Sequence, residues 1–153
     1  MYSIPDGPVR ARLAEIGDRV ETAVEECWRV ARRGGSLERG LESLDLAQVT
    51  ARLKKLRASR PSSPESTQSR DRTVEALQAQ IDSGERLARV ASDARDRLGL
   101  LDARLDEAVA RAVELSLQAE DASVLSGLGD DVEQLVGDLE TLRQGLEEIS
   151  AAR

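Results

Sequence analysis

Apolar residues between Val74 and Ala119 recur for about thirteen helical turns, and no proline interrupts them. Their steps of three and four are the a/d spacing of a coiled-coil seam, so the pattern predicts one long α-helix. The spacing slips once, between Gly84 and Leu87, and we expect the buried face of the helix to change there. The apolar positions are Val74, Leu77, Ile81, Leu87, Ala91, Ala94, Leu98, Leu101, Leu105, Ala108, Ala112, Leu115 and Ala119.

Prolines and glycines divide the rest of the chain. The four prolines lie at positions 5, 8, 61 and 64, and proline is poorly tolerated inside helices. They predict an N-terminal tail at 1–8, a helical hairpin at 9–58 and a Ser/Pro-rich flexible loop at 59–70. Residues 71–153 are then the long helix plus a C-terminal antiparallel helix, which form one domain with 9–58.

Local signals set the expected helix ends. The first helix should run from Val9 to Arg33, because Gly34 and Gly35 follow as a C-terminal stop. Ser36 should cap the second helix at its start. After a kink near Leu44, Asp45, with Gln48 three residues on, should cap that helix a second time.

Further signals mark the third and fourth helices. The long helix should begin near Asp71 or Thr73. The segment from Ser126 to Gly129 is expected to be a helix stop, which starts the fourth helix at Asp131.

Helix lengths then predict the packing. The second helix should return along the N-terminal half of the long helix, and the fourth along its C-terminal half. The first helix is expected on the second and at the same end of the long helix. The fold class is therefore all-α, an elongated antiparallel helical bundle or intramolecular coiled coil built on one long central helix.

The amino-acid composition limits the chemical functions that we expect of the chain. The chain has no histidine and one cysteine, which removes the usual general base and the commonest metal ligand. No Gly-rich phosphate loop or G-x-S-x-G elbow occurs. We therefore expect no enzyme, no catalytic residue, no metal, no cofactor and no small-molecule substrate. No apolar stretch reaches the ~18 residues of a membrane span and no secretory signal opens the chain, so a cytoplasmic protein is expected.

The net charge of −7 is unevenly distributed. Residues 1–60 carry 12 basic and 9 acidic groups, whereas residues 102–153 carry 4 and 13. Such polarity can steer association with a charged partner. The chain is acidic overall and has no aromatic residues interleaved with its basic run, so we do not expect nucleic-acid binding.

Two single residues on the first helix have alternative interpretations. Cys27 is in phase with the apolar seam and is expected to pack in the core rather than to act as a reactive thiol. Trp28, the single tryptophan, is either the edge of a wide core face, which we favour, or an anchor for a partner, since tryptophan is enriched at binding hot spots.

Two further surfaces are candidates for interaction. The basic stretch near residue 52 is either a solvated helix face or a contact for an anionic membrane surface or an acidic protein. The apolar seams of the long and fourth helices are expected to pack within the protein first. They would bind a partner only where one of their faces stays exposed. The seam residues of the long helix are Leu98, Leu101, Leu105 and Leu115. The candidate interaction surface comprises Trp28, Arg52, Lys54, Lys55, Arg57, Leu135, Leu139, Leu142 and Leu146.

These features predict a non-enzymatic helical scaffold that binds protein partners through coiled-coil faces and self-associates. The alternative is a peripheral membrane-associated envelope or stress-response protein. That protein would use the basic amphipathic helix around 46–60 and would not be integral to the membrane.

Overall fold

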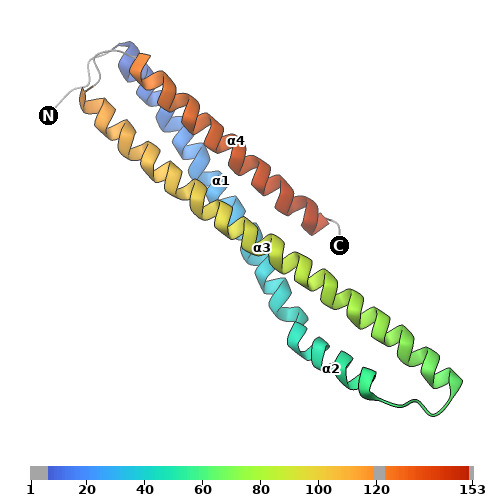
Figure 1. Ribbon diagram of the computed structural model, residues 1–153. Helices are drawn as coiled ribbons and strands as arrows, with labels where there is room; N and C mark the ends of the chain where they lie inside the picture. The colour runs from blue at the N-terminus through green and yellow to red at the C-terminus, as the bar shows by residue number, and fades with distance from the viewer. Residues whose placement is uncertain (1–6, 119–122, 152–153) are drawn as a thin grey trace. The chain divides into compact units, whose positions relative to one another are not determined.

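The computed structural model describes residues 7–118 and 123–151, and they form four helices (Figure 1). The helices are α1 (Pro8–Leu44), α2 (Leu46–Ala58), α3 (Pro64–Gln118) and α4 (Ser123–Ala151). No strand occurs in the described ranges. The expected all-α fold of antiparallel helices is confirmed, and α3 is continuous through Gly84 and Gly99.

The chain divides into two compact units. The first, here called the three-helix unit, comprises residues 1–34 and 94–153, and the second comprises residues 35–93. The assignment of residues 9–58 and 71–153 to one domain stays a prediction.

The three-helix unit contains the N-terminal part of α1, the C-terminal part of α3 and α4 (Figure 1). Polar contacts give the helix directions. Arg12 meets Ser126 and Arg19 meets Gly129, so α4 runs parallel to α1. The ion pairs Arg104–Asp138 and Arg111–Asp131 join α3 to α4. From the first pair to the second, the residue number rises on α3 and falls on α4, so α3 is antiparallel to α4 and also to α1. The shared buried core consists of Ile16, Ala23, Leu101, Leu105, Ala108, Leu125, Leu128, Val132, Leu135 and Leu139.

The second unit is built around the packing of α2 on the N-terminal part of α3. Leu53 of α2 is buried with Leu77 and Ile81 of α3, as the sequence predicts for the second helix. Gly84 permits a close approach here, because a Cβ at that position would lie 2.6 Å from Cδ2 of Leu46.

The expected end of the first helix at Arg33 is wrong. α1 continues through Gly34 and Gly35 to Leu44, and no glycine in the described ranges has the positive φ that a C-terminal stop requires. The apolar rhythm explains the continuation, because Val30 and Leu37 are seven residues apart and both are buried. Two interior glycines cost about 1 kcal/mol each against alanine, less than the loss of a packed turn.

The expected position of the first helix is wrong for the same reason. Without a turn at Gly34, the chain does not fold back there into a hairpin. Ile16 and Ala23 of α1 instead share a core with the C-terminal part of α3 and with α4.

Replacing Gly34 with alanine should therefore stabilise the protein by about 1 kcal/mol, the difference in helix propensity. A Cβ at Gly34 meets nothing within 4 Å. Urea denaturation followed by circular dichroism measures the change. A loss of stability would instead indicate the left-handed stop that the sequence suggests.

The break at Asp45 is confirmed. Asp45 separates α1 from α2, has φ 42°, and accepts a hydrogen bond through its side chain from the backbone N–H of Gln48. Aspartate tolerates this left-handed conformation better than most residues, so one residue both ends α1 and caps α2.

The other two helix starts come earlier in the chain than expected. α3 begins at Pro64, because the Ser63 hydroxyl accepts from the backbone N–H of Ser66 at 3.1 Å and proline suits the first helical position. The connection is therefore residues 59–63 rather than the loop expected at 59–70. α4 begins at Ser123 and includes Gly127 and Gly129, so the expected stop there is also wrong. Ala119, the last position of the long apolar series, lies outside the described residues.

Candidate functional site

A groove of about 480 Å³ runs between α1 and α3 in the three-helix unit. α1 contributes small and aromatic side chains to it, and α3 contributes Leu98, Gly99 and Leu105 with two charged neighbours. The groove forms because α4 packs on the other side of this helix pair, through Leu135 and Leu139. The lining residues are Val24, Cys27, Trp28, Ala31, Arg95, Leu98, Gly99, Asp102 and Leu105.

Trp28 is the largest side chain of this groove. Its exposed fraction is 64%, and that of neighbouring Val24 is 43%. The favoured interpretation of Trp28 as the edge of the core is therefore wrong, since the side chain lies mainly in solvent. Exposed tryptophan beside exposed valine is unusual for a solvated face and typical of binding surfaces.

Three further exposed apolar residues extend this face along α3. Val113 and Leu117 lie eighteen residues after Arg95 and Gly99, which is about five full turns and so the same side of the helix. Val109 follows Leu105 by about one turn. Their exposed fractions are 39% for Val109, 58% for Val113 and 77% for Leu117. The α1–α3 face is defined here as the groove together with these three residues.

Cys27 forms part of the groove floor. It is half-buried and packs against the core of the three-helix unit, which confirms the expected core role. Burial raises the pKa of the Cys27 thiol, and Asp102, Asp106 and Glu26 raise it further. The thiol is therefore less nucleophilic than an ordinary cysteine at neutral pH.

Glu26 is a buried carboxylate that sequence reasoning missed. Only 3% of its surface is exposed, and it accepts hydrogen bonds from Nη1 of Arg29 and Nε of Arg143, both at 2.7 Å. Arg143 also donates to Glu147. These hydrogen bonds, first to Glu26 and then to Glu147, raise the pKa of Arg143. The cluster ties α1 to α4 and fixes their register.

A sequence signal for Glu26 did exist. Steps of three and four from Ala23 to Val30 can pass through Glu26 as well as through Cys27. On α4, Arg143 similarly lies four residues after Leu139 and three before Leu146. Opposite charges in seam phase on two helices are a pattern that specifies register in coiled coils.

The seam of α4 is not a free surface. Leu135, Leu139 and Leu146 are buried, and Leu142 packs partly buried against the same core. The three buried leucines therefore have no exposed face through which they could bind a partner. The α3 seam residues Leu101 and Leu105 are likewise buried, with Leu98 and Leu115 partly so.

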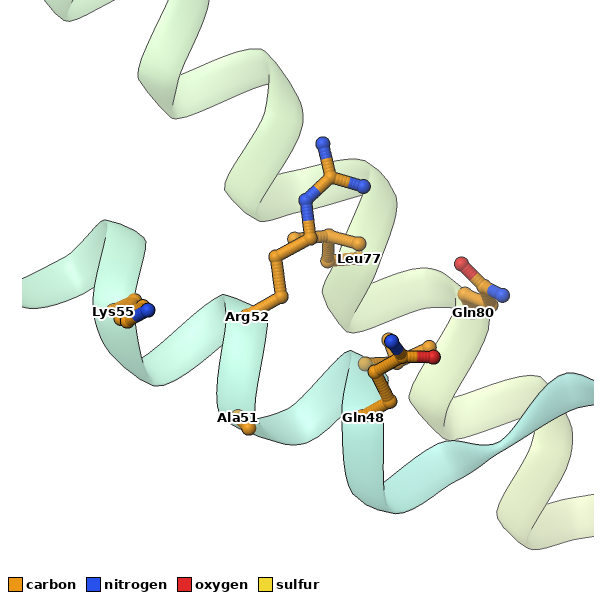
Figure 2. Close-up of a pocket in the computed structure, with 7 residues that line it drawn as sticks. Gln48, Ala51, Arg52, Lys55, Leu77 and Gln80 are labelled. Atoms are coloured by element: carbon orange, nitrogen blue, oxygen red, sulfur yellow. The ribbon is translucent and has the colours of Figure 1, made fainter.

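The basic residues of α2 belong to the second unit, whereas the α1–α3 face belongs to the three-helix unit. Arg52, Lys54, Lys55 and Arg57 are all exposed, and Arg57 donates to Gln78 Oε1 at 3.0 Å. Figure 2 shows Arg52 extending from α2 in the direction of Leu77 on α3, beside a shallow groove that Gln48 and Gln80 also line. The apolar face of α2 is occupied, because Leu53 is buried against α3.

The described residues hold no group of three or more histidine, cysteine or acidic side chains that could bind a metal ion. In the same ranges, no helix combines the length and the apolar character that crossing a bilayer requires.

The fold places the chain among all-α helical bundles. Comparison with protein-family models, with curated proteins and with solved structures finds no match to this chain.

Proposed function

We propose that the protein is a non-enzymatic interaction protein whose binding surface is the α1–α3 face. The observation that carries the proposal is the exposure of Trp28 beside a groove that two helices form. Contiguous exposed apolar patches mark interaction sites, whereas apolar residues scattered singly over a surface do not. The partner is either another protein or a second copy of the chain.

The geometry suggests how such binding would work. Two adjacent helices leave a groove between them, and a helix of the partner can insert its apolar side chains into that groove by knobs-into-holes packing. Trp28 would supply the anchor, since central tryptophans at interfaces contribute about 2 kcal/mol or more. Val24 and the exposed valines of α3 would extend the contact.

The alternative function, a peripheral membrane contact through α2, has less support. Its four cations are exposed, but insertion into a membrane surface also requires a free apolar helix face. Leu53 already buries that face against Leu77 and Ile81.

Site-directed photo-crosslinking in the native cell tests the proposal. Benzoylphenylalanine in place of Trp28 should give a discrete crosslinked product, because the reactive ring would lie in the interface. The matched control carries the same group in place of Gly137, which is exposed on α4 of the same unit. Circular dichroism checks that both variants fold.

The mass of the product identifies the kind of partner. A product of twice the chain mass indicates self-association, which light scattering on the purified protein would confirm, and any other mass indicates a different protein. Absence of a product from position 28, or equal products from both positions, would rule out the α1–α3 face as the binding surface.

A further inference from the structure

A second groove, of about 590 Å³, lies between α2 and α3 and belongs wholly to the second unit (Figure 2). It is here called the α2–α3 groove. Gln48, Arg52 and Lys55 follow one another on α2 at intervals of four and three residues. They therefore form one line along the helix, about 10 Å long at 1.5 Å per residue. The lining residues are Gln48, Val49, Ala51, Arg52, Lys55, Leu77 and Gln80.

The α2 side of this groove is cationic. Arg52 and Lys55 are exposed, and the described residues that line the groove include no acidic side chain. The whole of α2 has four basic residues and no acidic one. Asp45 is the acidic residue nearest to α2 along the chain, and its carboxylate accepts a hydrogen bond from the backbone N–H of Gln48. The positive charge is therefore concentrated toward the C-terminal half of α2.

The acidic residues of the adjoining part of α3 lie on the other side of that helix. At about 100° per residue, each is at least roughly 140° around the helix from Gln80. These residues are Asp71, Glu75, Asp82 and Glu85. Hydrogen bonds agree with this placement, because Asp82 accepts from Gln78 and Gln78 accepts from Arg57, and neither partner is among the described lining residues. The carboxylates of α3 therefore do not neutralise the cations of the groove.

The floor of the α2–α3 groove is apolar. Val49 packs only partly buried against the core of Leu53 and Leu77, and Ala51 is exposed. The aliphatic stems of arginine and lysine add apolar surface at the edge of such a groove. Packed helices lie about 8–10 Å apart, and an alanine at the contact allows the closer end of that range. A helix laid on this floor would bury Val49 further.

We propose that the α2–α3 groove binds one amphipathic helix of another protein, with aspartate or glutamate at intervals of three and four residues beside its apolar stripe. Carboxylates at that spacing would form charge-assisted hydrogen bonds with Arg52 and Lys55. The side-chain amides of Gln48 and Gln80 can donate to the same carboxylates. This groove is separate from the α1–α3 face, so the inference does not rest on the proposed function.

Nucleic acid and membrane fit the groove less well. Residues 35–93 contain no aromatic residue, whereas proteins that bind single strands use aromatic side chains to stack the bases. A duplex would contact the cations through its phosphates and would leave the apolar floor uncovered. A membrane surface requires a free apolar face on α2, and Leu53 buries that face against α3.

A second copy of the chain also fits less well. Its most acidic helix is α4, with seven acidic residues and one basic residue. The apolar stripe of α4 is already buried through Leu135 and Leu139. Four of the acidic residues of α4 form ion pairs with arginines of α1 and α3. α4 of a second copy therefore offers no free apolar stripe beside its carboxylates.

Two designed peptides test the inference on the full-length protein. Each is about four heptads long with leucine at a and d; one has glutamate at e and g, and the other has lysine there. Like charges at e and g keep each peptide from pairing with itself. Fluorescence anisotropy of the labelled glutamate peptide should show binding that weakens as salt is raised. The net charge of the protein is −7, so non-specific attraction would favour the lysine peptide instead.

Matched double variants assign the binding to the groove. Arg52→Gln with Lys55→Gln removes both cations that line it, whereas Lys54→Gln with Arg60→Gln removes two exposed cations outside it. The first variant should bind the glutamate peptide at least tenfold more weakly, about 1.4 kcal/mol. The second should change the affinity less than about threefold. Neither variant should weaken binding of the lysine peptide, and circular dichroism checks that both fold.

Four results would overturn the inference. The first is no binding of the glutamate peptide, and the second is an equal loss in both double variants, which would indicate attraction by overall charge. The third is a DNA duplex that binds more tightly than the peptide and depends on Arg52 and Lys55 in the same way. The fourth is self-association, measured by light scattering, that the Arg52→Gln and Lys55→Gln variant abolishes. Crosslinking from Trp28 reports on the α1–α3 face alone, so the proposed function stands or falls separately.

Discussion

Replacing Leu139 with alanine is expected to lower the free energy of unfolding of the three-helix unit by about 3 kcal/mol. None of the surface of Leu139 is exposed, and the side chain lies in the core that α1, α3 and α4 share. Truncation removes the apolar contacts of the leucine and leaves a cavity that three packed helices can close only in part. Since small domains are stable by about 5–15 kcal/mol, the loss is a large share of the total.

Urea denaturation followed by circular dichroism provides the test, because the described residues of the unit are helical from Pro8 onward. Leu117→Ala is the control, because Leu117 is 77% exposed and its truncation should cost less than about 0.5 kcal/mol. Similar midpoints for the two variants would contradict the core described here.

Replacing Glu26 with alanine is expected to cost about 2 kcal/mol. Removing one partner of a buried ion pair generally costs about 3–5 kcal/mol, because the other charge is left unpaired. Here the side chains of Arg29 and Arg143 keep 53% and 22% of their surface exposed and can regain water. The expected loss therefore falls below that range but well above that of a surface pair, about 0–1 kcal/mol.

Glu25→Ala is the matched control for this second prediction. Glu25 precedes Glu26 in α1 but is exposed, so its removal should be nearly neutral in the same urea titration. The effect at Glu26 should persist at about 0.5 M salt, since buried pairs are screened less than exposed ones. If high salt abolished the difference between the two variants, Glu26 would be acting as a surface charge.

The sequence predicts the helical class and several details of the helices. The seam of α4 and the cap at Asp45 follow from local signals alone: regular apolar spacing, and a side chain that can accept from a nearby N–H. α2 also lies on α3 as expected, because Leu53 and Ile81 are in phase with their own stripes.

Glycine is where the prediction failed. Gly34, Gly35, Gly127 and Gly129 were all expected to end helices, and all lie inside them. A glycine permits the left-handed conformation but does not require it. Whether a helix ends there depends on whether the next turn has a surface to pack on, which is a tertiary property. At α1 the wrong end at Gly34 also misplaced the whole N-terminal helix.

The α1–α3 groove has a partial signal in the sequence. After the slip near Gly84, the buried positions of α3 follow a new phase through Ala94, Leu101 and Ala108. The earlier phase, set by Val74 and Ile81, continues through positions that stay exposed. These positions are Arg95, Asp102 and Val109. The change of phase was expected, but the exposure of Trp28 was not, because the sequence does not show on which side α4 packs.

The position of the connection at residues 59–63 determines what a single cut of the backbone would do to the protein. Each compact unit contains chain from before this connection and chain from after it. A single backbone cut there would leave two fragments, neither of which holds a complete core. The fragments could separate only if both cores came apart, so the broken chain would remain a non-covalent complex. The usual dissection of a protein into independent pieces at its linkers therefore does not apply to this chain.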